Sequence, residues 1–266
     1  MAESSTPEGA LEPVGACTET PELPERQGAL RWRLLALAIA MTAVSCVGVS
    51  ASRVRSDGTA ELQRYCANGT KVAADGLLDD FEDADNRLAP ADGRGGYWWK
   101  SADSAGSQIG PDDFKPVPGG IGGSLAMQAF GKTASGGGDD GWGAQFGANL
   151  TPSGTYDASK YVGLRFMARV GEASTSSVRF KISDVNTHPD LGVCKTCWNH
   201  FGRDINLSTE WQEYELMFAS LEQAPYWGDP RPASITPEKL YSFDFQIGPG
   251  AQFDVWIDDM AFIECR

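Results

Sequence analysis

Two groups of neighbouring carboxylates lie near the two ends of the region that is expected to fold. Asp80, Glu82 and Asp83 form the first group, and Asp258 and Asp259 form the second. Hard cations such as Ca²⁺ bind several carboxylate and carbonyl oxygens at once. If the first and last strands pair side by side, these five residues predict a structural calcium site. The alternative is that strand alternation separates the carboxylates and leaves each one in water.

Polar and aromatic side chains suited to a hydroxyl-rich ligand recur at alternating positions of several strand-like segments. These residues are Arg165, Arg169, Arg179, Asp244, Gln246 and Trp256. If the strands that carry them are neighbours, they form one polar sheet face that can exchange hydrogen bonds with sugar hydroxyls and stack against a pyranose ring. The alternative is a solvated face with cross-strand pairs of arginine and aspartate.

Aromatic residues outside this pattern extend the predicted ligand site. In Tyr97-Trp98-Trp99 the first and third side chains share one face of a strand, so all three cannot enter one core. Trp227 lies in a loop rich in proline and glycine, where a large ring without a packing partner often marks a binding site. We therefore expect Tyr97, Trp99 and Trp227 to contact the ligand.

The segment 184–204 is polar, chemically varied and long for a connection between two strands. Long loops held by a disulfide are frequently functional, and this one contains a CxxC sequence. Asp184 and His200 are therefore added to the predicted ligand-binding residues. The alternative for a histidine in such a loop is an exposed side chain without a binding role.

Four of the six cysteines remain when Cys17 in the tail and Cys46 in the targeting segment are set aside. An even number in an exported domain is typical of disulfides. We predict one bridge between Cys66 and Cys265, which flank the first and last strands, and a short one between Cys194 and Cys197. A zinc site made of the CxxC and the two nearby histidines is the alternative, but no second cysteine pair stands at finger spacing.

The first 76 residues differ in composition from the rest. Residues 1–29 contain many proline and glutamate residues and few large apolar ones, so we expect a disordered tail. Residues 30–55 contain an uncharged run from Leu34 to Ser52 with arginines on both sides, which predicts a membrane-targeting segment. Residues 56–76 are interpreted as a linker.

Three interpretations of residues 30–55 remain open. The run is just long enough for a transmembrane anchor, it has the outline of a cleavable signal peptide, and Cys46 stands in a lipobox-like sequence as a candidate lipidation site. Each interpretation predicts export to the cell envelope or the extracellular space, and two of them predict a membrane anchor.

Residues 77–266 are predicted to form one all-β domain. Glycine is abundant, with 31 residues in the chain, and long helical periodicity is missing. Nine segments are interpreted as strands: 77–81, 97–101, 124–130, 143–150, 161–170, 178–185, 212–218, 241–247 and 253–263. Apolar and polar residues alternate in the clearest of them, which predicts a β-sandwich of two antiparallel sheets with wet outer faces.

Charge and motifs argue against several functions. The chain has 36 acidic and 22 basic residues and a net charge of −14, which repels phosphate backbones, so no nucleic-acid partner is expected. The GxGxxG sequence at 136–141 contains Asp139 and Asp140, which would repel a pyrophosphate. No intact catalytic motif is found, although the many paired carboxylates leave a glycosidase as an alternative.

The region from Leu77 to Ile263 resembles the galactose-binding-like jelly rolls, especially the family 11 type of carbohydrate-binding module in exported bacterial proteins. The resemblance rests on Leu78-Asp79-Asp80-Phe81-Glu82-Asp83, on Asn199-His200-Phe201-Gly202 before Leu207-Ser208-Thr209-Glu210-Trp211-Gln212, and on Phe253-Asp254-Val255-Trp256-Ile257-Asp258-Asp259. It implies a non-catalytic module that binds β-glucan or another polysaccharide on a concave sheet. It also implies structural calcium near the paired termini, with Glu82 and Asp259 at the positions of family metal ligands.

The sequence therefore predicts an exported β-sandwich, anchored to a membrane, that binds a polysaccharide or oligosaccharide without transforming it. A protein-interaction or cell-envelope structural module is the first alternative, because a related jelly roll of the CIA30-like type works in protein assembly and a fold does not fix a ligand. A polysaccharide-active enzyme is the second. An open groove lined with aromatic residues favours sugar binding, and two facing carboxylates in a cleft favour the enzyme.

Overall fold

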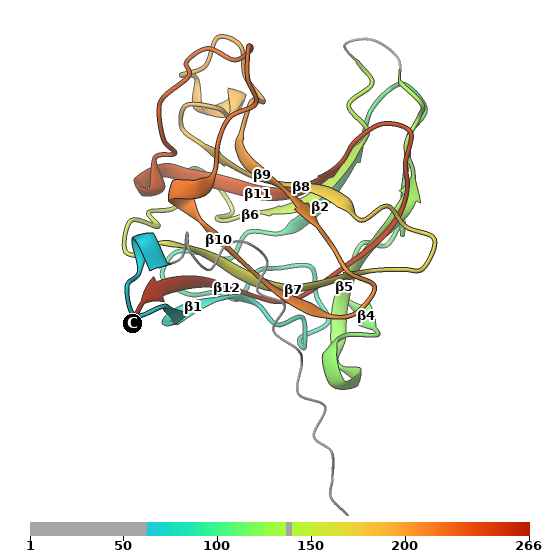
Figure 1. Cartoon of the computed structure of the whole chain (residues 1–266), viewed down its shortest axis with the longest axis horizontal. Coiled ribbons are helices and arrows are strands. Elements are labelled where there is room, and N and C mark those ends of the chain that lie inside the picture. Colours follow the sequence, from blue (N-terminus) through green and yellow to red (C-terminus); the bar gives the residue numbers. More distant parts are fainter. Residues whose placement is uncertain (1–62, 137–139) are drawn as a thin grey trace, which may run out of the picture. The chain divides into compact units, whose positions relative to one another are not determined.

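The computed structural model describes residues 63–136 and 140–266, which form a jelly-roll β-sandwich of two antiparallel sheets (Figure 1). The predictions for residues 1–29, for the segment 30–55 with Cys46 and for residues 56–62 lie outside the described residues. Within the described ranges no helix has the length and apolar character needed to cross a membrane.

The larger sheet has seven strands in the order β10-β7-β12-β5-β3, with β1 paired to β12 and β4 paired to β5. Its members are β1 (Thr70–Asp79), β3 (Gln108–Gly110), β4 (Val117–Pro118), β5 (Leu125–Lys132), β7 (Gly163–Val170), β10 (Gln212–Met217) and β12 (Gln252–Cys265). The long strand β12 pairs with β1, β5 and β7, so it organises this sheet.

The smaller sheet has five strands in the order β2-β6-β11-β8-β9. Its members are β2 (Trp98–Ala102), β6 (Ala144–Asn149), β8 (Ser177–Asp184), β9 (Phe201–Asn206) and β11 (Leu240–Ile247). Short 3-10 turns occur at η1 (Ile121–Gly123), η3 (Pro189–Leu191), η4 (Phe218–Ser220) and η5 (Pro237–Lys239). All ladders between these five strands are antiparallel.

The core lies between the two sheets and is filled by the apolar half of each alternating strand. Phe166 of the larger sheet packs against Phe180 and Phe245 of the smaller one, with ring centroids 5.6 and 5.1 Å apart. All three side chains are fully buried, and burial of each stabilises the fold by about 2 kcal/mol relative to exposure. The polar half of each strand consequently lies on an outer face.

All nine predicted strands are present, and β3, β4 and β9 are additional. Strand β1 begins at Thr70, inside the range 56–76 that the sequence assigned to a linker. Its register with β12 shifts between Val72 and Leu77, and this irregularity interrupts the alternation by which the strand would be recognised. The folded domain therefore starts earlier than expected.

Both predicted disulfides are present. Cys66 is bonded to Cys265 and Cys194 to Cys197, each with a Cα–Cα distance of 5.2 Å. The first bridge joins the residues that flank β1 and end β12. Because the second bridge uses both sulfurs of the CxxC, the zinc alternative loses its thiolate ligands.

Candidate functional site

The outer face of the five-stranded sheet presents three rows of residues that run across its strands. The strand register places Gly202, Lys181, Asp244, Gly147 and Trp99 in the central row. One flanking row contains Asp204, Arg179, Gln246, Gln145 and Ser101, and the other contains Ser183, Ser242 and Asn149. We call these three rows the polar face.

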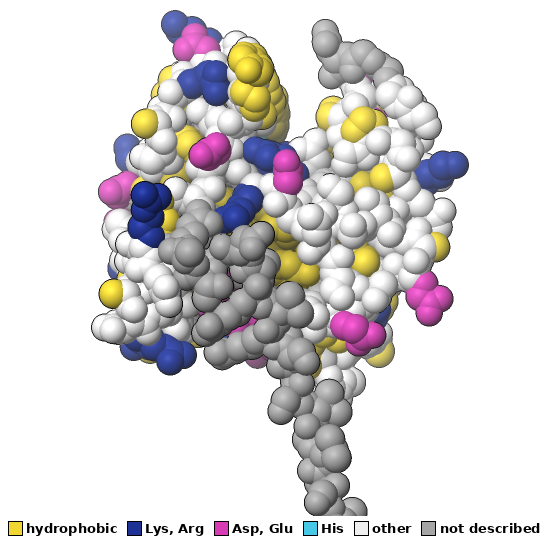
Figure 2. Space-filling view, viewed as in Figure 1, with side chains coloured by type: hydrophobic (Ala, Val, Ile, Leu, Met, Phe, Trp, Pro, Cys, Tyr) yellow, Lys and Arg dark blue, Asp and Glu magenta, His cyan; other side chains and the backbone are white. Residues whose placement is uncertain are grey.

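Loops at both ends of this sheet project away from the seven-stranded sheet. Residues 185–200 and 221–236 rise at the upper left of Figure 1, and the connection from β11 to β12 rises at the upper right. Figure 2 shows a hollow between these groups of loops, with hydrophobic side chains on the inner side of the left group and charged side chains near its base. The polar face therefore lies in a groove.

An ion pair occupies the centre of the polar face. Nζ of Lys181 lies 3.0 Å from Oδ1 of Asp244, and the two side chains are only 9% and 2% exposed. The same Nζ donates a hydrogen bond of 3.0 Å to Oε1 of Gln145. Burial raises the pKa of Asp244, and the charges of Lys181 and Arg179 oppose that change. The contacts hold these polar groups in fixed positions.

A gap without side chains separates this pair from the aromatic edge of the polar face. Gly147 stands between Asp244 and Trp99 in the central row, and a Cβ atom on it would lie 2.7 Å from Cβ of Asp244. Nε1 of Trp99 donates a hydrogen bond of 3.1 Å to Oδ1 of Asn149, which orients the partly exposed ring. The result is a shelf of bare backbone, about 4.8 Å wide, beside an indole ring.

The opposite edge of the polar face continues into a pocket of about 620 Å³. Nη1 of Arg179 lies 3.0 Å from Oδ1 of Asp204, and Nη2 donates to the carbonyl of Glu222 at 3.0 Å. The pocket is lined by Arg179, Gly202, Arg203, Asp204, Ser220, Glu222, Gln223, Ala224 and Pro225. Because the polar face and the pocket share Arg179, a long ligand can contact both.

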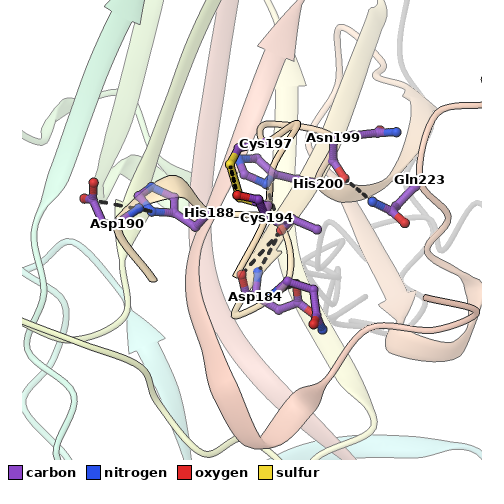
Figure 3. The surroundings of a disulfide bond; sticks show 10 residues. Asp184, His188, Asp190, Cys194, Cys197, Asn199, His200 and Gln223 are labelled. Atoms are coloured by element: carbon purple, nitrogen blue, oxygen red, sulfur yellow. Dashed lines mark hydrogen bonds and ion pairs between the residues drawn. A yellow bond between two sulfur atoms is a disulfide. The ribbon is translucent and has the colours of Figure 1, made fainter. Parts of the chain in front are cut away.

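Residues 185–200 and 221–230 form what we call the disulfide lobe (Figure 3). The ring of His188 stacks on Tyr241 at 3.9 Å, and Trp198 meets that imidazole edge-on at 5.3 Å. His200 is buried, and its Nδ1 lies 3.0 Å from Oγ1 of Thr187. Burial lowers the pKa of His200 well below its ordinary value, so the ring is neutral near pH 7.

The sequence-based grouping of six polar residues on one face is wrong, because the two halves lie on different sheets. Arg179, Asp244 and Gln246 belong to the polar face. Arg165, Arg169 and Trp256 lie on the outer face of the seven-stranded sheet, since β7 and β12 belong to it.

The three residues on the larger sheet make contacts of their own. The guanidinium of Arg169 lies 4.4 Å from the ring centroid of Trp256 and 5.2 Å from that of Trp211. Gly119 approaches the indole of Trp256 so closely that a Cβ atom on Gly119 would lie 2.8 Å from that ring. Arg165 pairs with Glu213 at 3.2 Å. None of these three residues can reach a ligand bound in the groove.

Asp184 and His200 support the groove wall from inside and are not exposed to a ligand. The carboxylate of Asp184 is fully buried; its Oδ1 accepts from the backbone of Asn186 and its Oδ2 from the backbone of Thr236. It therefore joins the loops that follow β8 and precede β11.

Tyr97, Trp99 and Trp227 are partly or largely exposed, as a ligand contact requires.

The carboxylates predicted to bind calcium do come near one another. The pKa of Asp259 lies above its ordinary value, mainly because of burial. The charge of Arg165 opposes this change, and the negative charges of Asp80 and Glu82 add to it. Four of the five carboxylates accept backbone hydrogen bonds; Oδ2 of Asp258 accepts from Ile121 and Oε1 of Glu82 from Leu125.

Asp83 accepts from the backbone of Asp85 in its own turn. In the described part of the chain no three His, Cys, Asp or Glu side chains group closely enough to hold a metal. Calcium stays a prediction.

The residues of the site that were not predicted include Lys181, Gln145, Asn149 and Tyr241. The alternation of β8 placed Lys181 outward between Arg179 and Ser183, so its position could be found from the sequence. Its pairing with Asp244 could not, because the contact depends on which strand lies beside β8.

No protein-family model matches the chain, and no curated protein matches it. Solved structures match the chain. The family 11 carbohydrate-binding module from Clostridium thermocellum, in complex with a β-1,3-1,4-mixed-linked tetrasaccharide, aligns with a TM-score of 0.51 and 19% identity over 73% of this chain and 98% of that chain. The family 11 module of the cellulosomal cellulase Lic26A-Cel5E of Clostridium thermocellum aligns with a TM-score of 0.50 and 18% identity over 73% and 94%. The resemblance predicted from the sequence is thereby confirmed for the fold: this domain is a jelly roll similar to family 11 carbohydrate-binding modules.

Proposed function

We propose that the polar face binds a polysaccharide or oligosaccharide and does not transform it. The observation that carries this proposal is the arrangement, in an open groove, of Trp99, the bare shelf at Gly147 and the accessible polar side chains of the flanking row that contains Arg179. A pyranose ring has an apolar face that stacks on an aromatic ring and an edge of hydroxyls that pairs with fixed donors and acceptors. The central row and this flanking row offer both kinds of contact side by side.

The ion pairs made by the carboxylates of the polar face support binding without catalysis. Its three rows contain two carboxylates, Asp204 and Asp244, and each is held by a cation. Glycoside hydrolysis requires one carboxyl that donates a proton and a second that acts as nucleophile or base on the opposite side of the bond. Asp244 is buried beneath the surface, so it is poorly placed for either role.

The first ligand to test is a mixed-linkage β-1,3-1,4-glucan. The family 11 module with the same fold was solved with a tetrasaccharide of that type. Identity of 19% does not transfer its specificity, so mannans, xylans and galactans belong in the same panel.

Export with membrane anchoring is the second part of the proposal. The two disulfides support it, because such bonds persist in oxidising compartments, and so does the uncharged run in residues 30–55. Protease treatment of intact cells tests it: we expect the domain to be degraded while a cytoplasmic marker survives. Mass spectrometry of the purified full chain then shows whether Cys46 carries a lipid.

Sugar binding is tested by isothermal titration calorimetry of the full chain with each polysaccharide. We expect saturable binding that Trp99→Ala weakens about tenfold or more, which corresponds to about 1.4 kcal/mol. Phe130→Ala is the matched control, because it removes a 42% exposed ring from β5 of the other sheet. If the wild-type chain binds none of the polysaccharides, sugar binding is wrong and a protein partner becomes the better hypothesis.

A further inference from the structure

Large hydrophobic side chains are exposed together on the disulfide lobe. The exposed residues there are Val193, Trp198, Tyr226 and Trp227, with Trp198 55% exposed. Trp198 also has a φ of +75°, a left-handed backbone conformation that is unfavourable for a bulky residue. Neither burial nor backbone preference explains a tryptophan at this position, and such outliers cluster where a protein contacts a ligand.

The Cys194–Cys197 disulfide holds the backbone in this conformation. It closes the turn directly before Trp198, whose N–H donates to the carbonyl of Thr187 at 2.9 Å. On the other side of the turn, the N–H of Lys195 donates to the carbonyl of Asp229 at 2.8 Å. The tryptophan is therefore presented by a turn that is fixed at both ends.

Trp198 belongs to residues 185–200, which border the groove on one side (Figure 1). The centroid of its indole ring is 5.3 Å from that of His188 and 5.9 Å from that of His200. His188 stacks on Tyr241, which lies at a register shift between Leu240 and the outward-facing Ser242 of β11. The phenol of Tyr241 donates to Oδ2 of Asp190 at 3.3 Å, so hydroxyl-binding groups accompany the ring.

Asn199 joins the two halves of the disulfide lobe. It is 3% exposed, and its Nδ2 donates to the carbonyls of Ala224, at 2.9 Å, and Trp227, at 2.6 Å. Its Oδ1 accepts from the N–H of Ala224 at 2.9 Å. The residues that follow the disulfide turn are thus hydrogen-bonded to the segment that carries Trp227.

We infer that Trp198 is a further sugar-stacking residue, held in place by the Cys194–Cys197 disulfide, at which a polysaccharide bound to the polar face continues onto the disulfide lobe. This inference rests on the proposed function and adds a second stacking position to it. The occupant is the same polysaccharide, because Trp198 packs against His188 and His200 in the loop that directly follows β8, a strand of the polar face.

The test measures binding of mixed-linkage β-1,3-1,4-glucan, mannan, xylan and galactan by calorimetry with the full chain. The variants are Trp198→Ala, Trp198→Tyr and the double variant Cys194→Ser/Cys197→Ser, with Phe130→Ala as the control. Fluorine NMR of protein labelled with 5-fluorotryptophan adds a direct readout, since Trp198→Ala identifies the signal of this ring. Melting temperatures show that each variant is folded.

We expect Trp198→Ala and the double cysteine variant to weaken binding about fivefold to tenfold, Trp198→Tyr to retain most of it, and the fluorine signal of Trp198 to shift when the polysaccharide is added. Wild-type affinity in either Trp198→Ala or the double cysteine variant, with the chain folded, overturns the inference while the proposed function stands. Absence of binding by the wild-type chain to all four polysaccharides overturns both.

Discussion

Lys181 and Asp244 stand opposite each other on β8 and β11 and form an ion pair of 3.0 Å that is almost completely shielded from water. A buried pair of this kind gains little over two apolar residues, but the loss of one partner leaves a charge without compensation. The polar face therefore depends on this contact for its shape as well as for its polarity.

Asp244→Asn is expected to lower the free energy of unfolding by about 3 to 5 kcal/mol, because Lys181 is then buried without its counter-charge. Lys181→Met/Asp244→Leu should recover most of that loss, because it removes both charges together. Urea denaturation of the three proteins measures the difference. Equal stability of the single and double variants would contradict a coupled pair.

The pH dependence of stability should reveal Asp79. Its carboxylate is buried, with Oδ2 accepting from Nε1 of Trp98 at 2.7 Å and Oδ1 from the N–H of Phe81 at 2.8 Å. Burial raises the pKa of Asp79 from 3.8 to about 7, although both hydrogen bonds act in the opposite direction. Between these two values the folded chain holds a proton that the unfolded chain has lost. The contribution of Asp79 to stability is therefore complete below pH 3.8 and is lost as the pH rises through about 7.

Burial lowers the pKa values of His188 and His200. Their contribution to stability is present above pH 6.5 and is lost as the pH falls below it, so it changes with pH in the direction opposite to that of Asp79. The measurement is therefore the difference in unfolding free energy between the wild type and Asp79→Asn from pH 4 to 8. We expect this difference to change steadily up to about pH 7 and then to level off. Asp112→Asn, a change at an exposed aspartate outside this turn, should leave the wild-type profile intact. A pH-independent difference for Asp79→Asn would contradict the assignment.

The two disulfides should differ in their effect on stability. Cys66 and Cys265 are 199 residues apart, whereas Cys194 and Cys197 are three apart. In the chain-entropy account, a bridge that closes a longer loop removes more freedom from the unfolded chain, up to about 5 kcal/mol for the long loop and about 2 kcal/mol for the short one. Thermal and urea unfolding of the two cysteine-to-serine double variants compare them. A larger loss from the short bridge would contradict this ranking.

Calcium binding by the terminal carboxylates can be tested without any ligand assay. If the cation binds the folded chain, a chelator should lower the melting temperature, by an amount equivalent to about 2.7 kcal/mol when free calcium is 100 times its dissociation constant. Glu82→Ala should then melt at the same temperature with and without the chelator. An unchanged wild-type melting curve would show that the carboxylates fold without a metal.

Much of the fold follows from alternation along single strands. Phe243, Phe245 and Ile247 are apolar at every second position of β11 and enter the core as expected. Strand β9 was missed because Gly202, Arg203 and Asp204 lack that pattern; it forms because its backbone pairs with β8. Strands β3 and β4, with three and two residues, are too short to show any period.

The candidate site was harder to predict, for a related reason. Alternation shows that Arg169 and Arg179 both point away from the core, but it does not show from which sheet. That choice depends on long-range pairing: β7 lies between β10 and β12, and β8 lies between β9 and β11. Burial of the carboxylate of Asp184, the last residue of β8, likewise depends on a partner, Thr236, that is distant in the sequence.

The bridge between Cys66 and Cys265 has a mechanical consequence. Residues Thr70 and Cys265 are partners in the ladder of β1 and β12, so tension applied to the chain before Cys66 passes through a covalent bond to the end of β12. The hydrogen bonds of β1 are bypassed and cannot be unzipped one by one from that end. A pulling force applied before Cys66 therefore acts on β12 of the seven-stranded sheet without first separating β1 from it. The polar face lies on the other sheet, outside this path of force.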